Sequence, residues 1–287
     1  MKKVALFVHC YPPAQGGLEY LSSEIVRVLS KKADVKVFTG KGRTLDSYKN
    51  FNNWIDDDSD ETRVHRLPLQ KWKQRLANKF LYHIVVKFGI FSPWYFGPLL
   101  NFSRQDDEII SKSDLILGIG MPTSSLVYAH KYSQKYNIPL IVLPAYHPIA
   151  YYNRVFVFQE ALQKAKKVLY LSKYEKVNLL KTYLVDKDKL QAINFSPFSK
   201  TDLLDVSDLV KTRLKKIKSR SLTIGFVGQI TSRKNLRMIA EISKSLSSRG
   251  FPNRILLAGL RTNTSDIVEE LFSENEDVEF EYNFSDK

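Results

Sequence analysis

Cysteine is almost absent from this sequence, because Cys10 is the only one among 287 residues. A single cysteine cannot form an intramolecular disulfide, so a reducing compartment fits best and we expect a cytoplasmic protein. Long apolar runs are missing too: none reaches the roughly 18 uncharged residues that a membrane-spanning helix needs. The first predicted strand starts at Val4, which predicts a chain without a signal peptide.

Motifs of two large protein classes are also missing. A dinucleotide oxidoreductase carries G-x-G-x-x-G after its first strand, where this chain has Pro-Pro-Ala-Gln-Gly-Gly. The net charge of +14 predicts an anionic partner, namely nucleic acid, a membrane surface or a phosphorylated substrate. Because no helix-turn-helix, zinc or RNA-binding motif accompanies that charge, we expect no nucleic-acid partner.

The stretch that organises the chain is its first two dozen residues. Residues 4–8 form an apolar, β-prone run, and two prolines then exclude a helix until Gly16 and Gly17. An amphipathic helix follows. A buried strand, a glycine turn and a helix N-terminus together favour an anion site, since backbone N–H groups point outward there. The alternative is a tight turn without a ligand.

Buried strands alternate with amphipathic helices along the rest of the chain. This pattern predicts an α/β protein with two Rossmann-like, doubly wound domains. We expect a first domain at 1–198, a basic linker at 199–220 and a second domain at 221–287, with a loop at 42–60. The second domain has too few predicted elements for a complete doubly wound fold, so we expect it to be incomplete and the chain to be the front part of a longer protein.

Residues 68–104 contain Lys and Arg but no Asp or Glu, interleaved with aromatic and aliphatic residues. This composition suits an anionic membrane interface, where aromatic rings insert and cations meet lipid phosphate. A packed helical pair with a basic rim is the alternative.

Several polar or glycine residues follow predicted strands, where ligands bind in parallel sheets. The candidates are Gly16, Gly17, Gly120, His147 and Ser172. A hydrogen-bonded histidine without catalytic function, and a structural Ser172 and Tyr146, are the alternatives.

Four stretches, in this order and spacing, resemble the retaining glycosyltransferases of family 4 (glycosyltransferase group 1), which have the GT-B fold. They are Tyr11-Pro12-Pro13 with Gly16-Gly17-Leu18-Glu19, then Pro144-Ala145-Tyr146-His147, Leu171-Ser172-Lys173-Tyr174-Glu175, and Gly225-Phe226-Val227-Gly228-Gln229 with Lys234-Asn235.

The resemblance implies a hexosyltransferase-type enzyme that binds a nucleotide-diphosphate sugar and transfers the sugar with retention, without a metal or cofactor. It implies that Gly16 and Gly17 approach the donor, that Lys234 neutralises the leaving diphosphate, and that His147 contacts the sugar. Glu19 would orient the acceptor or brace the glycine loop.

Two departures from the family pattern stand out. Gln229 replaces the usual arginine, and Arg233 is a nearby cation that can substitute for it. The family's pair of glutamates, which binds sugar and ribose, would lie beyond residue 287.

The sequence therefore predicts a transferase of envelope or surface glycan synthesis. It would act on a lipid-linked or polysaccharide acceptor, peripherally at the inner membrane face. A truncated or inactive transferase-like protein that binds a membrane or partner is the alternative.

Overall fold

A computed structural model describes residues 1–55, 63–81, 97–146, 156–194, 222–231, 234–259, 261, 265–273 and 277–282. The chain divides into two compact units, Met1–Pro197 and Phe198–Lys287. The expected linker at 199–220 lies outside the described residues.

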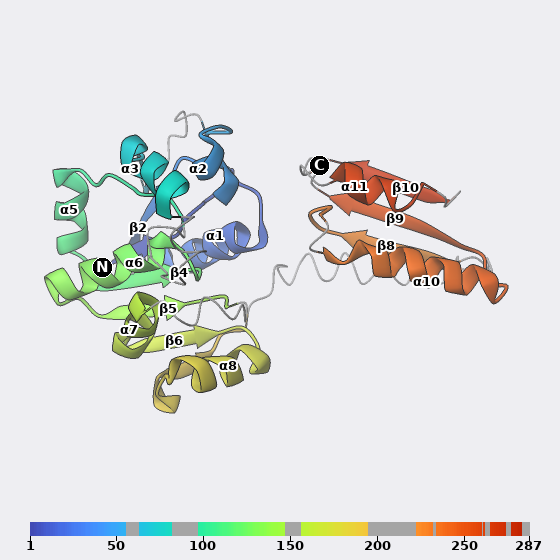
Figure 1. Cartoon of the computed structure of the whole chain (residues 1–287). Coiled ribbons are helices and arrows are strands. Elements are labelled where there is room, and N and C mark those ends of the chain that lie inside the picture. The colour runs from blue at the N-terminus through green and yellow to red at the C-terminus, as the bar shows by residue number, and fades with distance from the viewer. Residues whose placement is uncertain are drawn as a thin grey trace. The chain divides into compact units, whose positions relative to one another are not determined.

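Seven parallel strands form the sheet of the first unit, in the order β3-β2-β1-β4-β5-β6-β7 (Figure 1). The chain adds strands on one side of β1 and then moves to its other side, so the strand order reverses between β1 and β4. The strands are β1 (Lys2–Phe7), β2 (Ala33–Gly40), β3 (Val64–Leu67), β4 (Leu115–Ile119), β5 (Leu140–Leu143), β6 (Lys167–Tyr170) and β7 (Leu190–Ala192).

Helices cover both faces of this sheet, which is why its strands are apolar on both sides. Val4 and Leu6 of β1 pack with helix α1 in one core cluster, whereas Ala5 and Phe7 pack in the other cluster with helices α5 to α8. The helices are α1 (Gly17–Leu29), α2 (Leu45–Asn50), α3 (Lys71–Leu76), α5 (Arg104–Ser111), α6 (Ser124–Tyr136), α7 (Phe156–Lys164) and α8 (Lys173–Tyr183). A π-helical turn (Ala77–Leu81) continues α3, and a 3-10 turn (Lys187–Lys189) precedes β7.

The second unit repeats the pattern on a smaller scale. Its described strands β8 (Leu222–Val227), β9 (Asn253–Gly259) and β10 (Val278–Tyr282) form a parallel sheet in the order β10-β9-β8. Helices α10 (Leu236–Ser248) and α11 (Ser265–Glu270) contribute Leu236, Ala240 and Val268 to its core. The α/β fold with Rossmann-like units is therefore as predicted.

The expected loop at 42–60 is wrong in part, because it contains helix α2. Thr44 caps this helix: its Oγ1 accepts a hydrogen bond from the Ser47 backbone N–H, and the Ser47 hydroxyl accepts one from the Thr44 N–H. Such a reciprocal cap stabilises the start of a helix that is too short and polar to be recognised by apolar periodicity.

Candidate functional site

The glycine turn after β1 leads directly into helix α1. Gly16 is the residue before the helix, and its carbonyl accepts the first helical hydrogen bond, from Tyr20 N–H, at 3.0 Å. Gly16 provides no side chain to cap the helix. Free N–H groups at a helix start, together with the positive end of the helix dipole, are suited to an anion or a polar ligand.

Gly16 and Gly17 differ in their surroundings. A β-carbon on Gly16 would lie 2.1 Å from Oε2 of Glu19, whose side chain folds back over the turn. A β-carbon on Gly17 would meet nothing within 4 Å. The structure therefore uses the missing side chain of Gly16 to hold a carboxylate, and leaves open space at Gly17.

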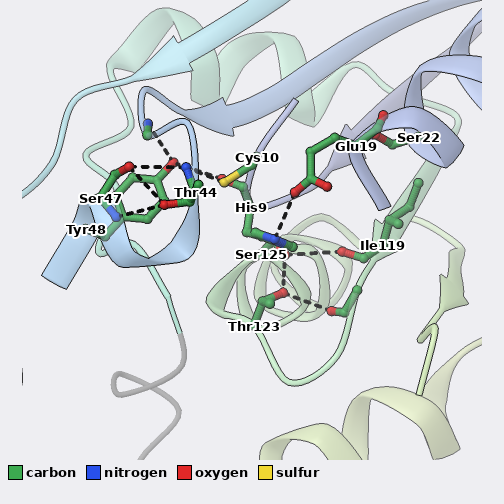
Figure 2. Close-up of polar contacts among 12 residues, drawn as sticks. His9, Cys10, Glu19, Ser22, Thr44, Ser47, Tyr48, Ile119, Thr123 and Ser125 are labelled. Carbon is green, nitrogen blue, oxygen red and sulfur yellow. Dashed lines mark hydrogen bonds and ion pairs between the residues drawn. The ribbon is translucent and has the colours of Figure 1, made fainter. Parts of the chain in front are cut away.

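Glu19 is buried and faces His9, the second residue after β1. Oε1 of Glu19 lies 3.5 Å from Nε2 of His9, and each residue is less than a tenth exposed (Figure 2). The other ring nitrogen, Nδ1, is buried without a hydrogen-bond partner. Sequence reasoning did not single out His9, although its position directly after a buried strand was a usable signal.

The Cys10 side chain contacts Tyr48 (Figure 2). Its sulfur lies 4.0 Å from the Tyr48 hydroxyl, which donates a hydrogen bond to the His9 carbonyl at 2.9 Å. Burial raises the pKa of the Cys10 thiol to about 12 and the pKa of Tyr48 well above its usual value. Cys10 is completely buried and protonated, as expected of a small core residue.

His9, Cys10 and Glu19 also carry three donor atoms that lie within 4.8 Å of one another. Nitrogen, sulfur and oxygen donors of this kind suit zinc. A metal takes cysteine as the thiolate, however, and burial of Cys10 opposes loss of its proton.

The end of β4 lies beside the end of β1, since these strands pair in parallel from Val4 and Leu115 to Phe7 and Gly118. Gly120 follows β4 with φ +89°, a conformation that favours glycine. The Thr123 hydroxyl donates to the Gly120 carbonyl at 2.9 Å and fixes the turn into α6. Gly120 and His9 thus follow the two strands between which the strand order reverses, which is the usual ligand position in such sheets.

Tyr146 and Ser172 follow the next two strands and take part in hydrogen bonds that join these turns to α8. Glu175 of α8 accepts hydrogen bonds from the Tyr146 N–H at 2.8 Å and the Leu171 N–H at 2.7 Å. The Ser172 hydroxyl accepts one from the Glu175 N–H and caps α8. His147, the predicted sugar contact, lies outside the described residues.

The glycine turn of the second unit joins β8 to helix α10. Gly228 has φ +152°, and Gln229 after it is half-buried. Lys234 is exposed just before α10, and its backbone N–H donates to the Thr231 carbonyl at 3.0 Å. Arg233 lies outside the described residues. A cation therefore lies close to the start of α10.

The basic segment is described at residues 68–81 and 97–104. Helix α3 exposes Trp72 (68%) and Leu76 (50%), which lie one turn apart. The Lys73 ammonium lies 5.4 Å from the centre of the Trp72 ring. Within the part of the chain that the structure describes, no helix is both long and apolar enough to cross a bilayer.

No known family model matches the sequence, and no curated protein matches it. Several solved structures, however, are similar to the chain. The chain is similar to Anabaena Alr3699/HepE in complex with UDP-glucose, at 15% identity and a TM-score of 0.57, over 99% of this chain and 70% of that chain.

A second similar structure is the N-terminal domain of Candida albicans trehalose-6-phosphate phosphatase. The TM-score is 0.59 at 12% identity, over 100% of this chain and 73% of that chain. Likeness at such low identity shows the fold alone, and the fold is of the GT-B type, with Rossmann-like units.

Proposed function

We propose that the protein is a retaining glycosyltransferase that takes its sugar from a nucleotide-diphosphate sugar. The observation that carries the proposal is the likeness of nearly the whole chain, both units included, to a protein that was solved with UDP-glucose. In both units a glycine turn joins the first strand to the helix after it, the arrangement that binds phosphate in nucleotide folds.

The open space at Gly17 supports a donor contact there, since a ligand can reach the backbone without a side chain in the way. Lys234 in the second unit would neutralise the charge that develops on the leaving diphosphate. Gln229 and Arg233 would hold phosphate oxygens beside it, and His147 would contact the transferred sugar. Glu19 braces the glycine turn in this proposal, because its carboxylate lies against Gly16. No metal or cofactor takes part.

The acceptor would be a lipid-linked or polysaccharide glycan at the inner membrane face. Exposed Trp72 and Leu76 on a helix that also carries Lys71, Lys73 and Arg75 support peripheral attachment to anionic lipid. The protein would thereby meet a lipid-linked acceptor without crossing the bilayer.

Titration calorimetry with UDP, UDP-glucose and other nucleotide sugars tests the donor site. We expect Lys234→Ala to lower the affinity for the diphosphate about tenfold, the typical effect of one charge-assisted hydrogen bond. Arg249→Ala is the matched control, since it removes an exposed cation from the other end of the same helix. Equal affinity of the two variants, or no binding of any nucleotide sugar, would refute the proposed site.

Transfer itself is measured with a labelled nucleotide sugar and lipid-linked or polysaccharide acceptors, with NMR of the product anomer. Retained configuration is expected. Donor binding without any transfer would instead favour the inactive, partner-binding alternative.

A further inference from the structure

The unpartnered nitrogen of His9 is the feature that the proposed donor contacts leave unused. His9 is 7% exposed, and Nδ1 has no hydrogen-bond partner. A buried polar atom without a partner destabilises the folded chain, because it has lost its hydrogen bonds to water. A ligand that supplies a partner would recover this free energy on binding.

Glu19 determines which kind of partner Nδ1 can take. An ionised carboxylate only accepts hydrogen bonds, so the ring nitrogen that faces it, Nε2, carries the proton. In the neutral ring this leaves a lone pair on Nδ1. Nδ1 is then an acceptor, and the missing partner is a donor such as a hydroxyl.

Gly120 keeps the position in front of Nδ1 free of a side chain. A β-carbon at residue 120 would lie 3.5 Å from Nδ1 of His9 and 2.7 Å from Cδ2 of Leu18. The backbone of Gly120 and the Leu18 side chain therefore flank the nitrogen where β1 and β4 end (Figure 2 shows His9 with the β4 end residue Ile119).

The charge beside this position disfavours an anion. The Glu19 carboxylate contacts the opposite edge of the imidazole and also lies against Gly16. A phosphate oxygen at Nδ1 would find neither a proton on the neutral ring nor a favourable field. A neutral hydroxyl meets neither problem.

We propose that Nδ1 of His9 accepts a hydrogen bond from a sugar hydroxyl at the carboxyl ends of β1 and β4, with Glu19 fixing the tautomer of the ring. The inference rests on the proposed function for the class of ligand, a sugar, and adds the residue that binds it. His9 is a binding residue and Glu19 a positioning residue.

NMR of the full chain with ¹⁵N-labelled histidine tests the proposal directly. The free protein is expected to show the Nε2–H tautomer of His9. UDP-glucose, or free glucose at millimolar concentration, is expected to shift the Nδ1 resonance, and UDP alone is not. A shift of equal size with UDP alone, or no shift with either sugar-containing probe, would overturn the proposal.

Two substitutions distinguish a binding role of His9 from a purely structural role. His9→Asn keeps an amide oxygen near the Nδ1 position, whereas His9→Leu removes every acceptor, and both lose the contact with Glu19. We expect His9→Leu to weaken binding of the sugar-containing probe at least tenfold and His9→Asn by less than about threefold. Equal losses for the two variants would mean that the role of His9 is structural.

His65→Leu is the matched control. His65 pairs with Asp106 at 3.0 Å, so this variant also breaks a histidine–carboxylate pair, but on edge strand β3. Its sugar affinity should equal that of the parent protein.

The remaining outcomes are distinguishable from a failure of the proposed function. UDP-glucose that binds by calorimetry without moving His9 Nδ1 would refute this inference alone, whereas absence of all nucleotide-sugar binding would refute the donor proposal. A Co²⁺ charge-transfer absorption that disappears in Cys10→Ser would instead assign His9, Cys10 and Glu19 to a metal site, against the inference.

Discussion

The Glu19 carboxylate occupies the space that a side chain on Gly16 would need, since Oε2 lies 2.1 Å from the position of such a β-carbon. The same carboxylate faces His9 at 3.5 Å, so one glycine supports a buried histidine–carboxylate contact. The glycine turn thus has two functions that are separable by mutation: Gly16 accommodates Glu19, and Gly17 leaves space at the helix start.

Gly16→Ala should lower the free energy of unfolding by about 1–3 kcal/mol, because it displaces a buried carboxylate from its partner. Gly17→Ala is the control, and it should leave stability unchanged or raise it by up to about 1 kcal/mol through lower chain entropy and higher helix propensity. Urea unfolding followed by fluorescence measures both. Equal effects of the two alanines would contradict the role assigned to Gly16.

Gly259→Ala should lower the free energy of unfolding of the second unit by at least about 2 kcal/mol. Residue 259 has φ +154°, and a β-carbon there would lie 1.7 Å from the Gly228 carbonyl oxygen. Gly225→Ala, with nothing within 4 Å, is the matched control on β8. Hydrogen exchange of the β8 and β9 amides measures the change.

The tryptophans provide an internal reference for that experiment. All three, Trp54, Trp72 and Trp94, precede residue 198, so their fluorescence reports on the first unit. In Gly259→Ala we expect the β8 and β9 amides to lose protection from hydrogen exchange. The urea unfolding transition followed by tryptophan fluorescence should not change. Normal protection in Gly259→Ala would refute the steric argument.

The strands were predictable from sequence, and the buried contact between His9 and Glu19 was not. Apolar runs such as residues 222–227 specify a strand locally, and β8 has these same bounds. The contact between His9 and Glu19 depends on how the intervening turn folds back, which no periodicity encodes. Helix α5 was likewise not predicted: it is short, and a reciprocal cap between Ser103 and Asp106 stabilises its start.

His130 should make stability depend on pH. Burial lowers its pKa below the usual 6.5, despite Glu160 at 3.4 Å, and Nδ1 has no hydrogen-bond partner. The unfolded chain then binds more protons than the folded one as the pH falls through about 6.5 toward the folded pKa, so the free energy of unfolding decreases over that window. A difference of one bound proton changes the free energy of unfolding by at most about 1.4 kcal/mol per pH unit.

Replacing this histidine tests the assignment. His130→Gln should flatten the dependence of the unfolding free energy on pH between about 5 and 7, measured by urea unfolding at several pH values. His65→Gln is a comparison variant with another histidine–carboxylate pair. An unchanged slope in His130→Gln would mean that other groups cause the pH dependence.

Reversing the charges of Lys71, Lys73 and Arg75 to Glu should abolish binding to vesicles that contain anionic lipid. Each cation near such a surface contributes about 1 kcal/mol, so the affinity should fall by more than about a hundredfold. Trp72→Ser alone should also weaken binding to these vesicles. Its effect should persist at high salt, because salt screens the charges and not the apolar contact of this exposed ring. Vesicle sedimentation measures both changes.

The matched control reverses three exposed lysines elsewhere in the first unit, Lys31, Lys32 and Lys187. Net charge changes equally in the two triple variants, so a general electrostatic effect predicts equal losses. A membrane-binding face on α3 predicts that only the first variant loses binding, because its cations lie on the same helix as the exposed Trp72 and Leu76. Equal sedimentation of the two variants would refute the membrane interface and leave the charge of +14 to be explained by another anionic partner.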